Sequence, residues 1–227
     1  MARILKKRGI YLEEKAKKNA KLAILFLTTG FICIIISSYF PFLIYIPFIS
    51  FSVSLFFFAK YRGFRKGFEG ENLVTDCLKN LDDSYYIIND IRLRHGNIDH
   101  IVLGPNGIFV IETKNYDGEI TCNGDIWIKK YYTKRGWEEH EIKSPSKQAK
   151  RNALKIKEII ERKIDKHLWI DAIVVFTNPS ITLHLNNNPI PVLQLHELCD
   201  YIKNKVGIKL SPSEIKIIGK VILENRI

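Results

Sequence analysis

The chain has 227 residues, with 35 lysines and arginines against 24 aspartates and glutamates, and a formal net charge of +11. This length accommodates one globular domain and an additional segment, at roughly 150 residues per domain. Residues 1–21 hold eight basic and two acidic side chains, and residues 60–66 hold four basic ones. The rest carries 23 basic and 22 acidic groups, so the high net charge is not evidence for a nucleic-acid-binding domain.

Residues 22–59 contain no charged side chain and are rich in isoleucine, leucine, phenylalanine and valine. A helix that crosses a bilayer needs about 20 such residues. The segment therefore predicts two short spans, at about 22–38 and 42–59, with a turn at Ser37–Pro41. A single kinked helix or a re-entrant loop is the alternative. The segment is too long for a cleaved signal peptide, and no small-x-small cleavage pattern follows it.

Basic residues flank this apolar segment on both sides, which by the positive-inside rule places both flanks in the cytoplasm. We therefore expect a two-pass protein of the cell membrane, with the lipid bilayer contacting residues 22–59. Residues 1–21 would form a basic cytoplasmic arm with a short surface helix, and residues 60–66 a juxtamembrane flank. The soluble domain would follow almost directly, from Gly67.

Hydrophobic periodicity predicts the elements of this domain in chain order. A helix begins near Gly67 and ends near Asp82. Three strands follow at about 85–91, 98–103 and 107–114, and then a hairpin of strands 118–122 and 126–132 with Asn123–Gly124 as its turn.

The second half begins with a long helix that opens at Ser144–Pro145, a capping residue followed by proline at the first helical position. Residues 169–177 predict a buried central strand. Prolines 189 and 191 restrict strand 190–195 to a sheet edge, and helices 196–205 and 212–225 end the chain. We expect an α/β fold (α+β, mixed sheet) with flanking helices, comprising a domain at 67–180 and C-terminal elements at 181–227 that pack on it.

Three polar residues occupy two adjacent apolar strands, and they are the candidate catalytic centre. The strands carry Asp99 and then Glu112-Thr113-Lys114, separated by a Gly-Pro-Asn-Gly turn. The Glu-x-Lys pattern occurs five times in the chain, but only this one ends a run of large apolar residues. Strand alternation places Glu112 and Lys114 on one face, near Asp99 of the neighbouring antiparallel strand. A surface ion pair at a strand end is the alternative interpretation.

This set of side chains suits a metal-dependent phosphodiesterase. Mg²⁺ prefers one or two carboxylates together with water and phosphate oxygens, so Asp99 and Glu112 would bind Mg²⁺ (or Mn²⁺). The Thr113 carbonyl offers a further oxygen. The metal would activate a water molecule and neutralise charge in the transition state, and Lys114 would orient that water or the scissile phosphate.

Auxiliary residues are expected on the two flanking helices. Glu71 shares the inward face of the first helix and would complete the acidic cluster or hold a second metal ion through water, unless it is only a carboxylate near a helix N-terminus. Gln148 lies in the first turn of the long helix, where a phosphate is favoured. Lys147 and Arg151 lie on the same helix and would contact phosphates of the substrate. The alternative is that they form a solvated helix face together with Lys150 and Lys155.

Other polar and aromatic residues are expected to be structural. Trp127 and Trp137 are interpreted as packing residues rather than base-stacking platforms, and His100 points to the opposite face of its strand from Asp99. Cys33, Cys77, Cys122 and Cys199 form no Cys-x-x-Cys pair and are expected to be free buried thiols in a reducing compartment.

Several of these residues and their order along the chain resemble the nuclease-related domain, NERD. The resemblance covers about residues 67–180 and rests on Gly67-x-x-Gly70-Glu71, Ile98-Asp99-His100, Gly104-Pro105-x-Gly107 through Glu112-x-Lys114-Asn115, Gly118-x-Ile120, Trp127 and Pro145-x-x-Gln148. It implies a restriction-endonuclease-like, PD-(D/E)xK fold, with Asp99, Glu112 and Lys114 as the core site and Glu71 and Gln148 as auxiliaries. Ile98 replaces the proline of the "PD" motif.

We therefore expect a membrane-anchored, cytoplasm-facing nuclease that hydrolyses nucleic acid, with DNA favoured over RNA. One alternative is a catalytically inactive, membrane-tethered module that binds nucleic acid or protein. Another is a membrane component whose soluble domain is regulatory, although the two spans offer no ionisable residue for transport.

Overall fold

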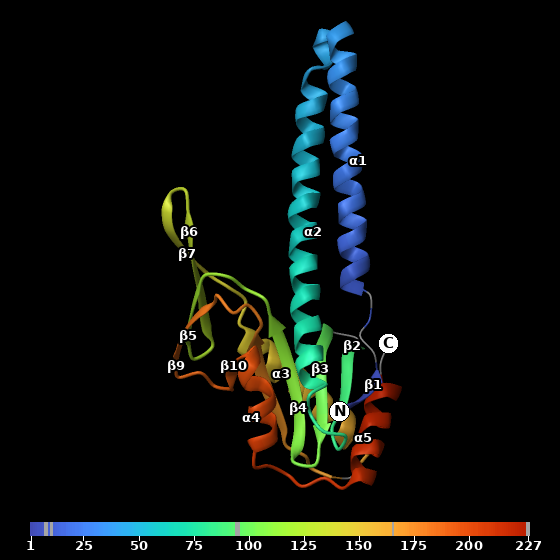
Figure 1. Ribbon diagram of the computed structural model, residues 1–227, viewed down its shortest axis with the longest axis vertical. Helices are drawn as coiled ribbons and strands as arrows, with labels where there is room; N and C mark the ends of the chain where they lie inside the picture. Colours follow the sequence, from blue (N-terminus) through green and yellow to red (C-terminus); the bar gives the residue numbers. More distant parts are fainter. Residues whose placement is uncertain (7–8, 10, 94–95, 165, 226–227) are drawn as a thin grey trace. The chain divides into compact units, whose positions relative to one another are not determined.

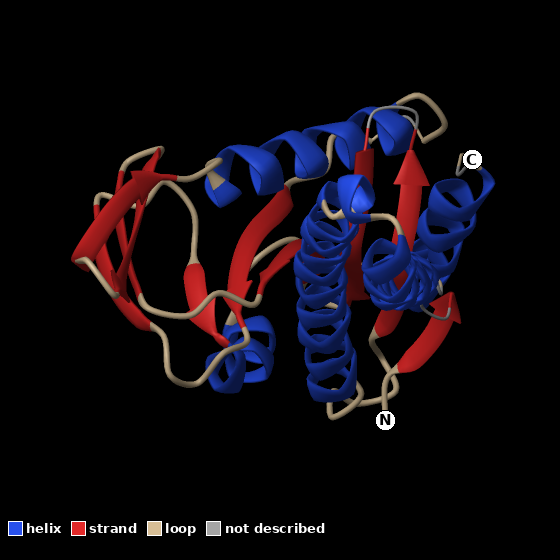
Figure 2. Cartoon of the chain, turned by 90° about the horizontal axis from the view of Figure 1, so that it is seen from above, coloured by secondary structure: helices blue, strands red, loops and turns tan. Residues whose placement is uncertain are grey.

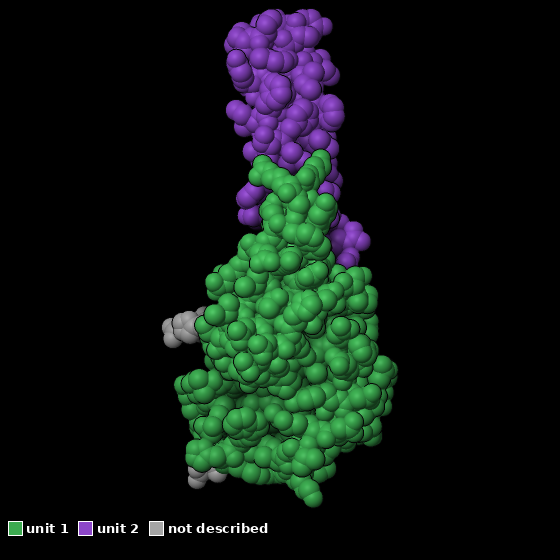
Figure 3. Space-filling view, turned by 90° about the vertical axis from the view of Figure 1, so that its left-hand side faces the viewer, with its two compact units in different colours: residues 1–8, 70–227 green, residues 9–69 purple. Residues whose placement is uncertain are grey.

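The protein is described from a computed structural model, which covers residues 1–6, 9, 11–93, 96–164 and 166–225 (Figure 1). The chain divides into two compact units, coloured separately in Figure 3. One comprises residues 9–69, and the other comprises residues 1–8 together with 70–227.

The first unit contains two antiparallel helices joined by a short 3₁₀ helix (Pro41–Leu43). They are α1 (Tyr11–Tyr39) and the part of α2 (Tyr45–Leu78) that ends at Glu69, and both helices are long and apolar enough to cross a membrane. Ser54 donates a hydrogen bond to the carbonyl of Ala23 (2.7 Å), a contact typical of helices that pack in lipid. The structure thus has the two predicted apolar helices rather than a single one.

Helix α2 differs from the prediction in its length. The helix expected to begin near Gly67 is the C-terminal part of α2, which runs without interruption to Leu78. Residues 60–66 contain no proline, and the isolated Gly63 is tolerated inside a helix. The Arg65 guanidinium also contacts the Glu69 carboxylate one turn later, at 2.8 Å. The basic flank is therefore helical.

The second unit is built on a mixed six-stranded sheet, in the order β1-β2-β3-β4-β8-β10. β2, β3 and β4 are antiparallel neighbours, whereas β8 runs parallel to both β4 and β10. β8 is internal and β10 is at the edge, as predicted. The strands are β1 (Arg3–Lys6), β2 (Tyr86–Leu93), β3 (Gly96–Gly104), β4 (Gly107–Lys114), β8 (Ile170–Phe176) and β10 (Val192–Gln194).

The N-terminal strand β1 was not predicted. Residues 3–6 of the basic arm pair in parallel with β2, with Arg3 opposite Tyr86 and Ile4 opposite Ile87. The backbone N–H of Ala2 also donates to the carbonyl of Lys79 at 3.3 Å. This edge strand belongs to the same sheet as the candidate site, although the α1–α2 segment separates the two in sequence.

A second, four-stranded sheet has the order β7-β6-β5-β9. The predicted hairpin is present as β5 (Glu119–Asn123) and β6 (Ile126–Thr133). Its two-residue turn is Gly124–Asp125, one residue later than expected, because Asn123 still pairs with Ile126 and Gly124 adopts a φ of +60°. Strands β7 (Gly136–Glu141) and β9 (Thr182–Asn186) were missed, since both are short and largely polar or exposed.

Helices cover both faces of the larger sheet (Figure 2). α3 (Pro145–Glu161) and α5 (Pro212–Glu224) pack on one face, and the end of α2 with α4 (Leu198–Asn204), which follows a 3₁₀ turn (Leu195–Glu197), packs on the other. Along β4, Ile108 and Val110 belong to the α3 side, while Phe109 and Ile111 belong to the α2 side. Alternation then places the next even-numbered residues of β4 on the α3 side.

Candidate active site

Strands β3 and β4 bring Asp99 to the end of β4. Their register pairs His100 with Ile111, so Asp99 lies one position further along, beside Glu112. One carboxylate oxygen of Asp99 accepts a hydrogen bond from the backbone N–H of Thr113 at 2.8 Å. This bond fixes the orientation of the aspartate next to the Glu-x-Lys tripeptide, as the sequence predicted.

Glu112 is the most deeply buried of these carboxylates, with 2% of its surface exposed. Lys114 donates from Nζ to Oε1 of Glu112 at 2.6 Å and to Oε1 of Gln148 at 3.3 Å. The two residues of β4 and the first turn of α3 therefore meet in one cluster. Because buried charges are costly without a partner, this ion pair is far from an ordinary surface contact.

A further residue of this cluster, Asn152, was missed from the sequence. Its Nδ2 lies 3.4 Å from Oε2 of Glu112 and 3.3 Å from the carbonyl of Asn97, and its side chain is buried. Asn152 follows Gln148 by one helical turn, between the core residues Ala149 and Ala153. A polar residue within the buried stripe of a helix was the signal that could have identified it.

Trp127 fixes the start of α3. Its ring is completely buried, lies 6.0 Å from the ring of Phe176, and donates from Nε1 to the Ser146 hydroxyl at 3.2 Å. Ser144 caps the helix by accepting from the backbone N–H of Lys147. These contacts hold the first turn of α3, and with it Gln148, beside β4.

Glu71 and Gly70 are on α2, on the other side of the sheet. A Cβ at Gly70 would lie 2.9 Å from Cβ of Asn115 and 2.9 Å from Oγ1 of Thr177, so the glycine permits close approach to the ends of β4 and β8. The negative charge of Glu71 also contributes to the raised pKa of Glu112.

Burial, together with the neighbouring charge of Asp99, raises the pKa of Glu112 from 4.5 to about 8. Glu71 adds to this effect and Lys114 opposes it. Burial also disfavours the charge of Lys114, but the attraction of Glu112 outweighs it and raises the pKa of the lysine. The ionised form of Glu112 is therefore disfavoured in this cluster except where a cation such as Lys114 stabilises it.

Comparison with known proteins identifies the segment that carries this cluster. Residues 66–177 match the family described as the nuclease-related domain. This chain contains a NERD domain. It is also 46% identical over 61 residues to an uncharacterized protein of Bacillus anthracis, an alignment that covers 24% of this chain and 29% of the relative. The chain thus spans less than a third of that relative's length, and no solved structure shows a significant match.

The NERD domain provides oxygen ligands suited to a hard cation. Among the described residues, no group of three or more His, Cys, Asp or Glu side chains is positioned to bind a metal. Asp99 and Glu112 alone still satisfy the requirement of Mg²⁺, which takes one or two carboxylates and completes its shell with water and phosphate oxygens. The raised pKa of Glu112 means that a metal ion bound here would have to displace a proton from this carboxyl. Asp99 and Glu112 are thus the carboxylates that would be available to such a cation.

The remaining candidates of the NERD domain differ in exposure. Lys147 and Arg151 are exposed on α3, and Lys150 pairs with Asp125 at 2.9 Å. His100 is buried on the opposite face of β3 and contacts Oδ1 of Asn89 at 2.8 Å, consistent with a structural role.

The two tryptophans of the smaller sheet have different environments. Trp127 packs in the core, as expected. The expectation for Trp137 was wrong, because this residue is 57% exposed on the outer strand β7, where its ring contacts that of Tyr132. The four-stranded sheet leaves this surface uncovered, so the ring meets solvent rather than a core.

Proposed function

We propose that this protein is a membrane-anchored, metal-dependent nuclease that hydrolyses phosphodiester bonds of nucleic acid. The observation that carries the proposal is the buried Glu112, which is held between Lys114 and Asn152 and has a pKa raised by burial and by Asp99. A carboxylate kept at this cost inside a sheet is typical of a functional site. The NERD assignment supports the same class of reaction.

In this proposal Asp99 and Glu112 would bind Mg²⁺ or Mn²⁺, which supplies an activated water and neutralises charge on the phosphate. Lys114 would leave its bond with Glu112 when the metal binds there, and would then orient the water or the scissile phosphate. Glu71 and Gln148 would position water and substrate. Lys147 and Arg151, exposed beside Gln148, would contact flanking phosphates of DNA, which we favour over RNA.

We further propose that α1 and the apolar part of α2 cross the cell membrane with both flanks in the cytoplasm. The basic residues on both flanks support this orientation. The sheet provides independent support, because β1 precedes the apolar segment, β2 follows it, and the two strands are paired. Paired strands must lie on the same side of a membrane, so the segment between them crosses an even number of times.

The experiment uses the full chain in detergent, because a fragment starting at Gly67 would lack β1 and divide α2. Plasmid DNA, single-stranded DNA and RNA are incubated with Mg²⁺, Mn²⁺ or EDTA. We expect metal-dependent cleavage that is lost in Glu112→Ala and Lys114→Ala. Glu141→Ala and Lys143→Ala are matched controls, since this second Glu-x-Lys pattern is exposed.

The alternative function is an inactive module that binds nucleic acid or protein. The direct ion pair between Lys114 and Glu112 favours it, because Lys114 already supplies the cation that the carboxylate requires. Retained nucleic-acid binding without cleavage under all metal conditions would establish this alternative and refute the nuclease.

A further inference from the structure

Two cysteine thiols meet where the end of α2 packs against the start of α4. The Sγ atoms of Cys77 and Cys199 are 3.2 Å apart, although 122 positions separate the residues in sequence. The Cys199 thiol donates to the carbonyl of Cys77 at 3.0 Å, and the Cys77 thiol donates to the carbonyl of Leu195 at 3.6 Å. These contacts hold both sulfur atoms at the edge of the apolar core on the α2 and α4 side of the sheet, where Cys199 is a core residue and Cys77 packs against the core.

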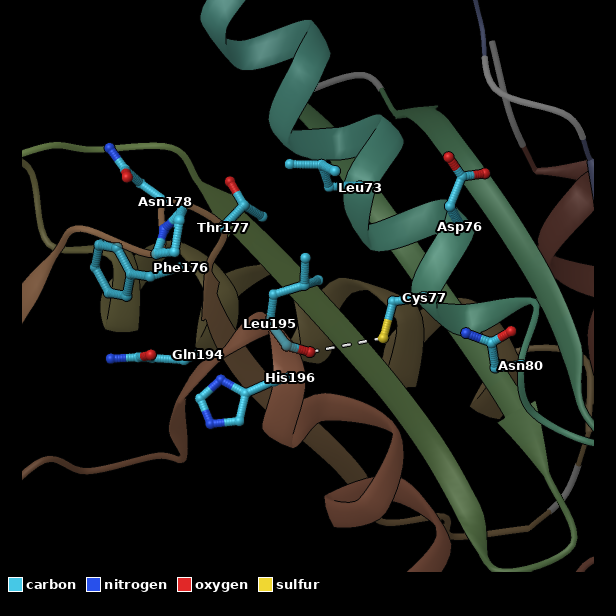
Figure 4. A pocket seen from close by; sticks show the side chains of 11 residues that line it. Leu73, Asp76, Cys77, Asn80, Phe176, Thr177, Asn178, Gln194, Leu195 and His196 are labelled. Atoms are coloured by element: carbon cyan, nitrogen blue, oxygen red, sulfur yellow. Dashed lines mark hydrogen bonds between the residues drawn. The ribbon is translucent and has the colours of Figure 1, made fainter.

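A cavity of about 610 Å³ gives access to one of these thiols. Cys77 lines the cavity beside Leu195, and exposed residues such as Leu73 and His196 form other parts of its wall (Figure 4). Cys199 does not line it and is 9% exposed. A reagent that enters the cavity therefore meets Cys77 first.

The contact between the thiols also makes them chemically unequal. The contact between the two thiols lowers the pKa of Cys77 to about 7, against an ordinary value of 9, and raises the pKa of Cys199. Since the thiolate is the nucleophile in exchange reactions, accessibility and ionisation select the same residue. Cys77 is the expected attacking thiol, and Cys199 is placed to resolve the product.

We propose that Cys77 and Cys199 form a redox modification site, which a low-molecular-weight disulfide entering the cavity converts to an intramolecular disulfide. The Cys77 thiolate attacks one sulfur of the reagent, forming a mixed disulfide and releasing one thiol. Cys199 then attacks Cys77, and the second thiol of the reagent leaves. The protein loses two electrons and the two thiol protons, and the reagent is reduced to two thiols.

The geometry requires only a small movement for this reaction. A disulfide is about 2.05 Å long, so the sulfur atoms must approach by about 1.1 Å. The bond would join the last turn of α2 covalently to α4. Because Glu71 and Gly70 lie on the same helix, oxidation would also restrict how that helix moves against the ends of β4 and β8. This inference does not depend on nuclease activity.

The test treats the reduced full chain in detergent with oxidised glutathione, blocks the remaining thiols with N-ethylmaleimide and maps the peptides by mass spectrometry. We expect a Cys77–Cys199 cross-link that dithiothreitol reverses, with Cys122 blocked as a free thiol. Cys122 is the internal control, because it is fully buried and donates to the carbonyl of Gly124. Cys77 and Cys199 both recovered as free thiols would overturn the proposal.

Two variants test the order of the steps. Cys199→Ser should accumulate a glutathione adduct on Cys77, whereas Cys77→Ser should leave Cys199 unmodified. An adduct on Cys199 in the second variant, or none on Cys77 in the first, would refute the assigned roles. Oxidation should also raise the melting temperature of the wild type and not of Cys199→Ser. The wild-type map needs no substitution, so it decides the cross-link even if a variant does not fold.

Discussion

The side-chain amide of Asn152 lies 3.4 Å from Oε2 of Glu112, while Lys114 contacts the other oxygen of the same carboxylate at 2.6 Å. Glu112 is therefore held from both sides, by α3 and by its own strand. Where a side chain holds a metal ligand in place, its removal commonly lowers metal affinity or activity by about 10–100-fold.

Asn152→Ala should therefore weaken Mg²⁺ binding by about tenfold without unfolding the domain, because the variant removes a donor that favours the ionised carboxylate. Isothermal titration calorimetry measures the affinity. Leu154→Ala is the matched control, since Leu154 is exposed on the same helix. Equal Mg²⁺ affinities for Asn152→Ala and the wild type would contradict the positioning role.

Lys114→Met should destabilise the protein by about 3 kcal/mol at pH 8, because it leaves Glu112 buried beside other carboxylates without its partner. The loss should be smaller at pH 5, where Glu112 holds a proton. Urea unfolding followed by tryptophan fluorescence measures both values. Lys157→Met, which removes a partly exposed helical pair with Glu161, should cost at most about 0.5 kcal/mol. Similar losses for the two variants would argue against a buried ion pair.

Metal binding should compete with a proton on Glu112. The folded-state pKa of about 8 exceeds the ordinary 4.5, so the stabilising contribution of this carboxyl is complete below pH 4.5 and is lost as the pH rises through 8. Mg²⁺ needs the ionised form, and its affinity should therefore rise by up to about tenfold per pH unit until about pH 8. Calorimetry at pH 7 in buffers of different ionisation enthalpy should detect the released proton. Binding without proton release would contradict this assignment.

Substitution by alanine should change the stability of the protein in opposite directions at two glycines of α2. Gly70→Ala places Cβ 2.9 Å from Asn115 and Thr177, and should destabilise the domain by about 1–3 kcal/mol through overpacking. Gly63→Ala meets no atom within 4 Å and should stabilise the helix by about 0.5–1 kcal/mol. Thermal unfolding of the two variants measures both. A neutral Gly70→Ala would show that α2 does not approach the strand ends this closely.

Local sequence signals predicted the parts of the fold that depend on neighbouring residues. The apolar runs and the Gly-Pro-Asn-Gly turn indicated β3 and β4, and the Ser144–Pro145 pair marked the start of α3. Alternation along β4 placed Glu112 and Lys114 on one face, where the structure brings them together with Gln148. The relation of Asp99 to the tripeptide also followed from strand pairing.

The features that the sequence did not predict depend on distant partners. β1 has four residues, and its pairing with β2 spans more than 80 positions, which no local pattern encodes. Trp127 and Trp137 both lie on strands of the smaller sheet, and the sequence alone does not distinguish them. Trp137 is exposed because its face of that sheet is not covered. Asn152 acquires its role only when α3 packs against β4. The approach of Cys77 to Cys199 likewise arises from packing between remote helices.

The pairing of β1 with β2 also determines the order of events during synthesis. The ribosome makes β1 first, then both apolar helices, and only afterwards the strand that pairs with it. An unpaired strand is a site for association with other chains, and charged side chains such as Arg3 and Lys6 oppose this. β1 must therefore remain unpaired while both helices are synthesised, and the edge of the sheet is completed only after β2 has been made.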